Sequence, residues 1–349
     1  MNNNTLKITL GVSLASLILG VSPAHSQETH VLKVADTYPV GHPFAEYGLL
    51  VFISEVESMS DGRITFEHFP SGQMGGASTL PNMTRNGVID ISSVAPAYIS
   101  DQLPMSGVAD LPGLAESSCV ASKALINNMF QPGNTLYEAD FKRLQLRPLI
   151  AGVISGYEVM TTSTEIQEPA GVTGLAVRSS GGSIDRTVRQ LGGAGVAMPA
   201  SEMYESLLRG TVDGTVLGPV SASPYKLEEV IKYSTHGALL GSFTMTYSIG
   251  ERSFSRLPED LQEILVEAGH KATASLCEAL DRENIAAIDE MEKAGVEFFV
   301  IEDGTSREEW ANAISPVQEM WVEDMESIGR PGRQVLEEYK DAIELYSEK

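Results

Sequence analysis

The sequence predicts an α/β protein of two lobes, each with a mixed sheet flanked by helices. Short apolar strands alternate with helix-like segments between residues 31 and 217. Such alternation favours parallel or mixed sheets covered by helices. The 349-residue chain is also long enough to form two domains with separate cores. An apolar, strand-like run at 243–249 then indicates that the chain crosses back to the first lobe.

The first lobe is predicted from the spacing of apolar residues between residues 31 and 153. In chain order we expect a strand at 31–35, a helix at 42–60, a strand at 64–69, a helix through Leu80 and Met83, a strand at 88–94, a helix at 121–130 and a strand at 144–153. Asp61 and Gly62 end the first helix. The last strand leads the chain toward the second lobe.

The second lobe is predicted from strands at 159–162, 174–178, 195–198 and 211–217 and from helices at 184–191 and 202–209. Ser201 caps the second of these helices and Gly210 ends it. Pro258 opens the longest helical pattern, which runs to Ala294 and would be about 55 Å long if unbroken. The periodicity also permits a break at Gly269. A further helical region, interrupted at Pro316, follows.

The N-terminus is typical of a secretory signal peptide. Lys7 supplies a positive charge, residues 8–21 form a short apolar run, and Ala24-His25-Ser26 matches a cleavage site. We therefore expect residues 1–26 to be removed near Ser26 and Gln27 and the mature protein to be periplasmic. A retained N-terminal anchor is the less favoured alternative, because the run is short for a membrane span.

Charge and cysteine content exclude several classes of protein. The formal net charge of −23 disfavours binding to nucleic acid or to anionic lipid. It also repels an anionic ligand, so such a ligand would need a local cation. Cys119 and Cys277 are the only cysteines. They permit one disulfide, but their spacing does not enforce it, and we expect two buried free thiols. No sequence cluster predicts a metal site, and no cofactor is expected.

A cation suited to an acid ends one predicted strand. Arg178 closes the apolar stretch Gly174-Leu-Ala-Val-Arg178. An arginine presents a fixed fork of donors that matches the two oxygens of a carboxylate. Arg178 is therefore a candidate receptor for an acid, and an exposed arginine at a strand end is the alternative.

Several stretches of the chain resemble those of TRAP-transporter substrate-binding proteins, the periplasmic receptors for C4-dicarboxylates and other organic acids. The resemblance rests on the stretch ending at Arg178 and on these further segments: Gly62 to Gln73, Asn86 to Asp90, Leu111 to Leu114, Val196 to Pro199, Ser201 to Tyr204, Gly210 to Gly214, Glu229 to Tyr233 and Leu257 to Gln262. It covers nearly the whole mature chain.

The resemblance implies a two-lobed periplasmic binding protein fold with a long helix that spans both lobes. The expected division is 27–153 plus 242–283 for lobe 1 and 154–241 plus 284–349 for lobe 2. It also implies that Arg178 forms a salt bridge with the ligand carboxylate. Tyr98 would form a pocket wall, or pack in the core, and Met198 would lie behind or beside the ligand.

Two departures from the family pattern bear on the ligand. Glu158 stands where many members have a second arginine, and Gly218 stands where many have an asparagine. Val216 and Leu217 make the same region apolar. These changes favour a monocarboxylate with an apolar or aromatic body over a dicarboxylate or a sialic acid.

Two acidic residues leave a second ligand class open. An inward-facing Glu158 would suit a zwitterionic, ectoine-like solute, whereas a solvent-facing Glu158 would not contact the ligand. Asp36 poses the same question at the end of the first strand.

The sequence favours a binding protein over an enzyme. It contains no HExxH, GxGxxG or GxSxG motif. We therefore expect a receptor that closes over a small organic acid in the interlobe cleft and delivers it to TRAP membrane permease subunits. We expect a monomer. A sensor or scavenging protein of the same fold that works without a transporter is the alternative.

Overall fold

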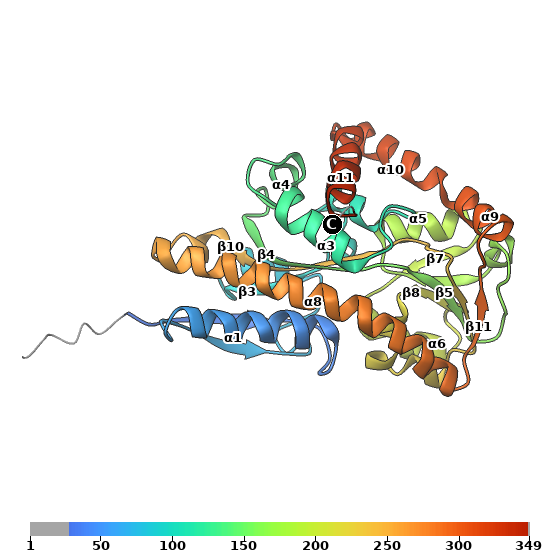
Figure 1. The fold of residues 1–349 in the computed structure, drawn as a ribbon, viewed down its shortest axis with the longest axis horizontal. Coiled ribbons are helices and arrows are strands. Elements are labelled where there is room, and N and C mark those ends of the chain that lie inside the picture. The colour runs from blue at the N-terminus through green and yellow to red at the C-terminus, as the bar shows by residue number, and fades with distance from the viewer. Residues whose placement is uncertain (1–27, 348–349) are drawn as a thin grey trace, which may run out of the picture.

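A computed structural model describes residues 28–347 and contains two mixed β-sheets flanked by helices. The first sheet has the strand order β2-β1-β3-β10-β4 and the second has the order β11-β9-β5-β8-β6-β7. Figure 1 shows the sheets side by side along the long axis of the molecule. We call each sheet, with the helices packed on it, a lobe. The predicted fold class is confirmed.

The first sheet is parallel at one edge and antiparallel at the other. Strand β1 pairs in parallel with β2 and β3, whereas β10 runs antiparallel to both β3 and β4. The strands are β1 (His30–Ala35), β2 (Ile64–Phe69), β3 (Ile91–Val94), β4 (Leu146–Ile154) and β10 (Phe243–Gly250). Each overlaps a strand predicted from the sequence, because buried strands carry continuous apolar runs.

The second sheet contains four strands that the sequence predicted and two that it did not. Its strands are β5 (Glu158–Thr161), β6 (Ala176–Ser179), β7 (Ala194–Ala197), β8 (Gly214–Leu217), β9 (Tyr233–His236) and β11 (Glu297–Val300). Strands β9 and β11 were not predicted. Both are short, and they pair with each other in parallel at one edge of the sheet.

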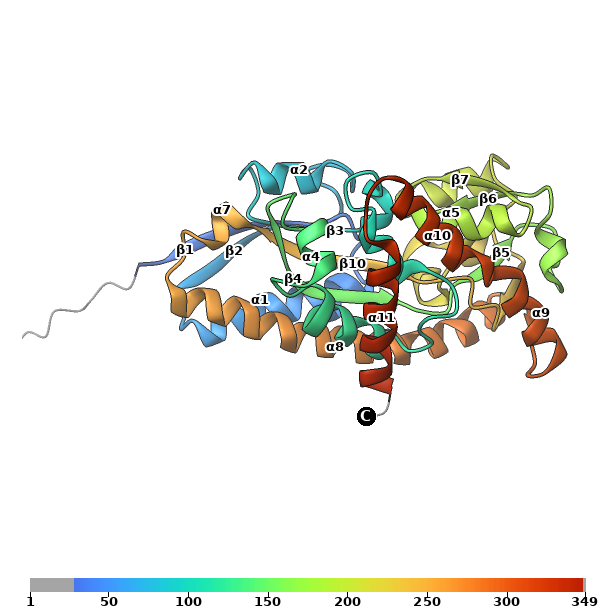
Figure 2. The same cartoon turned by 90° about the horizontal axis from the view of Figure 1, so that it is seen from above.

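The helices pack on the outer faces of the sheets (Figure 2). They are α1 (Leu50–Met59), α2 (Leu80–Arg85), α3 (Ser118–Ala124), α4 (Thr135–Ala139), α5 (Gly182–Gln190), α6 (Met203–Leu208), α7 (Glu251–Phe254), α8 (Glu259–Lys293), α9 (Thr305–Ile314), α10 (Pro316–Ser327) and α11 (Gly332–Ser347). The π-helical segments are η1 (Phe44–Leu49) and η4 (Leu125–Met129). The 3₁₀ segments are η2 (Pro96–Ile99), η3 (Met105–Asp110), η5 (Pro169–Val172), η6 (Ala200–Glu202), η7 (Pro219–Ser221), η8 (Ser223–Tyr225) and η9 (Leu227–Glu229). No helix among residues 28–347 is both long enough and apolar enough to span a membrane.

Helix α8 is the predicted long helix, and it runs unbroken past both sheets (Figures 1 and 2). It packs against α1 and β4 in the first lobe and leads into β11 of the second. Gly269 does not break it. A Cβ at Gly269 would lie 2.1 Å from the carbonyl oxygen of Leu149, so this glycine lets the helix approach β4 closely.

A disulfide between Cys119 and Cys277 corrects the prediction of two free thiols. It joins the start of α3 to α8. The Asp281 carboxylate, one turn further along α8, accepts hydrogen bonds from Ser117 Oγ and from the backbone N–H of Ser118. The cysteines meet because α3 packs across α8. They are 158 residues apart in the sequence, so their spacing did not predict this contact.

Within residues 28–347 the chain passes between the lobes at four places. Residues 155–157 join β4 to β5, residues 237–242 join β9 to β10, α8 makes the third passage, and α9 and α10 lead the chain from β11 back to α11. The C-terminal helix α11 then packs against α3, η3 and η4 of the first lobe. The first two crossings bring strand ends of both sheets to one place, where ligands of α/β proteins bind.

Candidate functional site

Arg178 lies in β6 at the junction of the lobes, and its side chain is buried. Its exposed fraction is 1%. The guanidinium Nε and Nη2 donate to the backbone carbonyl of Met198, at 3.0 and 2.8 Å. Nη1 is also buried and has no hydrogen-bond partner among the described residues. A buried charged donor without a partner is costly, so this end of the guanidinium suits an incoming carboxylate.

Tyr98 brings the first lobe to Arg178. It lies in η2, directly after β3. Its hydroxyl oxygen accepts a hydrogen bond from Arg178 Nη2 at 3.4 Å and another from the backbone N–H of Ala200 at 3.1 Å. The hydroxyl therefore connects the two lobes beside the unpartnered Nη1.

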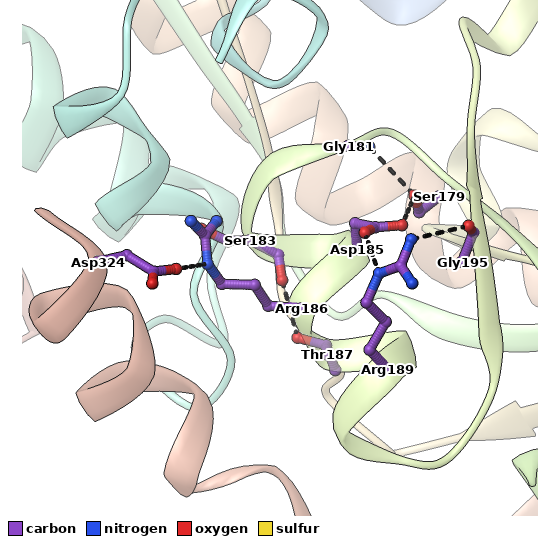
Figure 3. A network of polar contacts seen from close by, with 9 residues as sticks. All are labelled: Ser179, Gly181, Ser183, Asp185, Arg186, Thr187, Arg189, Gly195 and Asp324. Carbon is purple, nitrogen blue, oxygen red and sulfur yellow. Dashed lines mark hydrogen bonds and ion pairs between the residues drawn. The ribbon is translucent and has the colours of Figure 1, made fainter. Parts of the chain in front are cut away.

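The turn after Arg178 is held by the polar network of Figure 3. The Asp185 carboxylate accepts hydrogen bonds from Ser179 Oγ at 3.0 Å and from Arg189 Nε at 2.6 Å. Gly181 has a φ of +94°, and a Cβ there would lie 2.8 Å from the carbonyl oxygen of Ala97. Glycine at this position therefore permits the close approach of the lobes that sets Tyr98 beside Arg178.

Most of the wall facing Arg178 is built from rings that were not predicted from the sequence. The pocket is lined by Tyr38, His42, Phe44, Tyr98, Ile154, Tyr157, Arg178, Ala200, Leu217, Ser221, Tyr225 and Phe243. Phe243 lies at the centre, with ring centroids 5.4 Å from Tyr98, 6.4 Å from Tyr157 and 6.3 Å from Phe44. Position along the chain was the available signal for some of them. Tyr38 and His42 lie in the loop after β1, Tyr157 lies at a lobe crossing, and Phe243 begins β10, whereas Phe44 and Tyr225 lie in η1 and η8.

His42 is uncharged in this wall at neutral pH, because burial lowers its pKa to about 3. Arg178 is then the only side chain lining the described pocket that carries a charge at neutral pH. Burial raises the pKa of Tyr157 and of Tyr225 well above the ordinary value, so both hydroxyls stay protonated. The pocket combines one cation with neutral polar groups and aromatic rings.

The pocket is nearly closed in this conformation. Its free space is about 10 Å³, roughly the minimum that one water molecule needs. Two larger cavities, of about 600 and 300 Å³, flank it, and both contain Tyr98 and Pro199. The larger one does not include Arg178, and its own Arg186 and Arg189 are paired with Asp324 and Asp185. Arg178 is therefore the candidate group for binding an acid, and a ligand could enter this pocket only if the lobes or side chains separate.

Of the predicted ligand-binding residues Leu217, Met198 and Gly218, only the first lines the pocket around Arg178. Leu217 lines the pocket. The Met198 side chain lines the larger neighbouring cavity, and its carbonyl holds the guanidinium. Gly218 does not line the pocket but allows its wall to pack, because a Cβ there would lie 2.3 Å from Ile154 Cγ2.

Glu158 lies outside the pocket and is not solvent-facing. It is 2% exposed, and its carboxylate accepts hydrogen bonds from Thr235 Oγ1 at 2.6 Å and from the N–H groups of Gly237 and Ala238 at 2.8 and 3.1 Å. Glu158 therefore faces neither solvent nor the pocket around Arg178. Glu158 fixes the crossing from β9 to β10, and burial raises its pKa to about 7.

Asp36 is likewise occupied by its own lobe. Its carboxylate lies 3.0 Å from His68 Nε2 and accepts a hydrogen bond from the backbone N–H of Tyr38. The side chain is fully buried and does not line the pocket. No group of acidic, histidine or cysteine residues that could hold a metal ion occurs within residues 28–347.

The comparisons with known proteins agree with this geometry. The model of the family described as bacterial extracellular solute-binding protein, family 7, matches residues 35–324. The chain belongs to this family. The predicted resemblance to TRAP solute-binding proteins is therefore confirmed. The family consists of solute-binding proteins and not enzymes, as expected, and its extracellular character agrees with the predicted periplasmic location. The predicted signal peptide lies outside the described residues.

Two proteins similar in sequence to this chain are distant relatives. A solute-binding protein of Albidiferax ferrireducens is 24% identical over 300 residues, which cover 84% of this chain and 86% of the relative. The C4-dicarboxylate-binding periplasmic protein DctP of Rhodobacter capsulatus is 27% identical over 173 residues, 48% of this chain and 51% of the relative.

Solved structures of TRAP solute-binding proteins share the fold. A TRAP solute-binding protein from Rhodoferax ferrireducens, in complex with copurified benzoate, superposes with a TM-score of 0.84 at 24% identity and covers 92% of this chain and 99% of its own. One from Bordetella bronchiseptica, with bound mandelate, has a TM-score of 0.80 at 23% identity and covers 90% and 99%. A Sulfitobacter protein with bound galacturonate has a TM-score of 0.78 at 20% identity and covers 89% and 99%.

Proposed function

We propose that this TRAP solute-binding receptor captures an organic acid with one carboxylate and an apolar or aromatic body. The observation that carries the proposal is the buried guanidinium of Arg178, whose Nη1 lacks a partner and lies at a wall of aromatic rings. The guanidinium supplies the donors for a carboxylate, and the rings supply apolar surface for the ligand body.

The charges around the pocket support one carboxylate and no ammonium group on the ligand. A dicarboxylate would place a second anion in a pocket whose only charged lining residue is Arg178. An ectoine-like zwitterion would need an anionic partner, but Glu158 and Asp36 are held by their own hydrogen bonds outside the pocket. Burying either charge without a partner would cost several kcal/mol.

The ligands of similar proteins are compatible with this proposal and do not decide it. Benzoate and mandelate, bound by two of the similar structures, are aromatic monocarboxylates. A third binds galacturonate, which is a sugar acid. The aromatic wall of this chain favours the first class.

We further propose that the two lobes close over the acid and present it to the TRAP membrane permease, with the protein acting as a monomer. Residues 27–153, 242–283 and 332–349 would form lobe 1, and residues 154–241 plus 284–331 would form lobe 2. The packing of α11 against α3 supports moving the C-terminal helix from the second lobe to the first. The crossings at 155–157 and 237–242 would then serve as hinges.

A thermal-shift screen of the mature protein tests the proposal. The panel contains aromatic monocarboxylates, aliphatic dicarboxylates, uronates and ectoine-like zwitterions. A ligand at 100 times its Kd stabilises the folded state by about 2.7 kcal/mol, so a true ligand gives a clear shift. We expect the largest shifts with aromatic monocarboxylates. A larger shift with a dicarboxylate, a uronate or a zwitterion would overturn the proposed ligand class.

A further inference from the structure

We propose that the end of the pocket at His42 and Tyr225 recognises an uncharged oxygen substituent on the ligand, such as a hydroxyl or keto group. The ligand class is then a hydroxylated or oxo-substituted aromatic monocarboxylate. This inference rests on the proposed function, because it assumes that the carboxylate binds Arg178. The evidence is the position and hydrogen-bonding state of polar groups in the pocket wall.

The tautomer of His42 is set by a backbone hydrogen bond. The N–H of Phe44 donates to His42 Nδ1 at 3.2 Å, so the ring proton resides on Nε2. His42 Nε2 forms no hydrogen bond with another described residue. The ring lies among Tyr38, Phe44 and Tyr225, with centroid distances of 4.7, 5.1 and 5.7 Å. His42 therefore offers the pocket a neutral N–H donor.

Three tyrosine hydroxyls in the same wall also lack protein partners. The hydroxyls of Tyr38, Tyr157 and Tyr225 form no hydrogen bond within the part of the chain that the structure describes. Tyr98 differs, since its hydroxyl is engaged by Arg178 and Ala200. None of the three oxygens is among the fully buried polar atoms that lack a partner, so each is open to the free space beside it. Unpartnered hydroxyls that line a binding pocket are therefore suited to polar groups of the ligand.

The two polar ends of the pocket are separated by phenyl rings. At one end Tyr98 contacts Arg178. The rings then follow from Tyr98 to Phe243, from Phe243 to Phe44 and from Phe44 to His42, with centroid distances of 5.4, 6.3 and 5.1 Å. The Tyr225 ring packs edge-on against His42, with a centroid distance of 5.7 Å. This order fits a ligand with a carboxylate at one end, an aromatic ring in the middle and a polar substituent at the other end.

The substituent must be uncharged because the His42 end has no counter-charge. The two nearest acids along the chain are Glu46 and Asp36. Glu46 accepts a hydrogen bond from the Gly41 N–H, and Asp36 is bound by His68. His42 itself is neutral. A second carboxylate or an ammonium group placed there would lose its hydration without gaining a charged partner. A hydroxyl or keto oxygen instead gains a donor from His42 or a tyrosine.

Calorimetric titration of the mature protein tests the inference with five probes: benzoate, 3-hydroxybenzoate, 4-hydroxybenzoate, isophthalate and 3-(aminomethyl)benzoate. One or two additional hydrogen bonds correspond to about 3- to 30-fold in Kd. We expect at least one hydroxybenzoate to bind more tightly than benzoate by that factor. Isophthalate and the aminomethyl compound should bind more weakly than benzoate.

Two variants locate the effect at the proposed groups. His42→Asn retains an acceptor for the Phe44 N–H and removes the Nε2 donor, and Tyr225→Phe removes only a hydroxyl. Each should weaken the preferred hydroxybenzoate by about 3- to 30-fold and change benzoate affinity by less than about twofold. Tyr204→Phe is the matched control, since the Tyr204 hydroxyl donates to Glu229 and is not in the pocket wall. It should leave both affinities unchanged.

The outcomes separate this inference from the proposed function. Equal binding of benzoate and both hydroxybenzoates, or equal loss for both ligands in the variants, overturns the inference. The proposed function survives that result if benzoate binding still requires Arg178. Isophthalate that binds as tightly as the best hydroxybenzoate also overturns the inference. Failure of every aromatic acid to bind overturns both.

Discussion

At the scale of single residues, the arrangement around Arg178 explains why a lysine would not replace it. Three donors of the guanidinium have distinct directions: Nε and Nη2 hold the Met198 carbonyl, and Nη1 has no partner. The backbone contact fixes the orientation of the fork before the ligand arrives. A lysine has one nitrogen on a flexible stem, so it cannot hold the carbonyl and a carboxylate in this geometry.

We expect Arg178→Lys to weaken binding of the cognate acid by roughly 10- to 100-fold, because the charged hydrogen bond from the oriented Nη1 is lost. Isothermal titration measures the change. Arg209→Lys is the control, since Arg209 forms an exposed ion pair with Glu205. Wild-type affinity in Arg178→Lys would show that the ligand carboxylate binds elsewhere.

The sequence predicted part of this site and missed the rest for a physical reason. Arg178 ends a predicted strand of visible apolar pattern, and the resemblance to the family implied that Tyr98, after another predicted strand, forms a pocket wall. His42, Tyr157 and Tyr225 have no common local pattern. They meet only because separate loops converge at the lobe junction, a contact that spacing along the chain does not reveal.

At the scale of elements, the contact between α8 and β4 depends on the absence of a side chain. A glycine inside a helix usually costs about 1 kcal/mol relative to alanine. Gly269 is an exception because the Leu149 carbonyl occupies the space of its Cβ. The glycine that suggested a break in the helix instead permits its packing.

Gly269→Ala should therefore lower the free energy of unfolding by about 1–3 kcal/mol, the usual range for overpacking. Urea unfolding measures it. The exposed Glu278→Ala in the same helix should change stability by less than about 0.5 kcal/mol. Stabilisation by Gly269→Ala would mean that α8 moves away from β4 without cost.

The disulfide should stabilise the protein without controlling binding. Neither Cys119 nor Cys277 lines the pocket. The paired variant Cys119→Ser, Cys277→Ser should lose about 2–4 kcal/mol of unfolding free energy. Its affinity for the acid should stay within about twofold, because the Asp281 contacts still hold the start of α3.

Urea unfolding with and without a reducing agent measures this effect. The reducing agent should destabilise the wild-type protein and leave the serine variant unchanged. Equal stability of the reduced and oxidised wild-type protein would contradict the prediction.

At the scale of the whole molecule, three buried carboxyl groups make stability depend on pH. Burial raises the pKa of Asp110, Asp140 and Glu158 to about 7. Their unfolded pKa values lie near 4, so between these values the folded state binds protons that the unfolded state has released. The stability that they contribute is complete below about pH 4 and is lost as the pH rises through 7.

We expect the melting temperature to fall between pH 6.5 and 8. Each of the three carboxyl groups should lower the free energy of unfolding by roughly 1 kcal/mol over this range. His42 does not offset this loss. Because its pKa is lowered from 6.5 to about 3, its titration changes the free energy of unfolding only below about pH 6.5. Scanning calorimetry measures the slope. Asp110→Asn and Asp140→Asn keep the hydrogen-bond acceptors for the N–H groups of Thr244 and Ser106. Each variant should make the melting temperature less dependent on pH. An unchanged slope in both variants would place the titration elsewhere.

The sequence by itself determined the fold class, the long helix, the family and the position of Arg178. Each depends on features that are local in the chain: apolar periodicity, turn residues and short motifs. The tertiary structure decided that Cys119 pairs with Cys277, that Glu158 is held at a lobe crossing and that aromatic rings face Arg178. Those features depend on groups that are distant in sequence, and only the crossings between the two sheets bring them together.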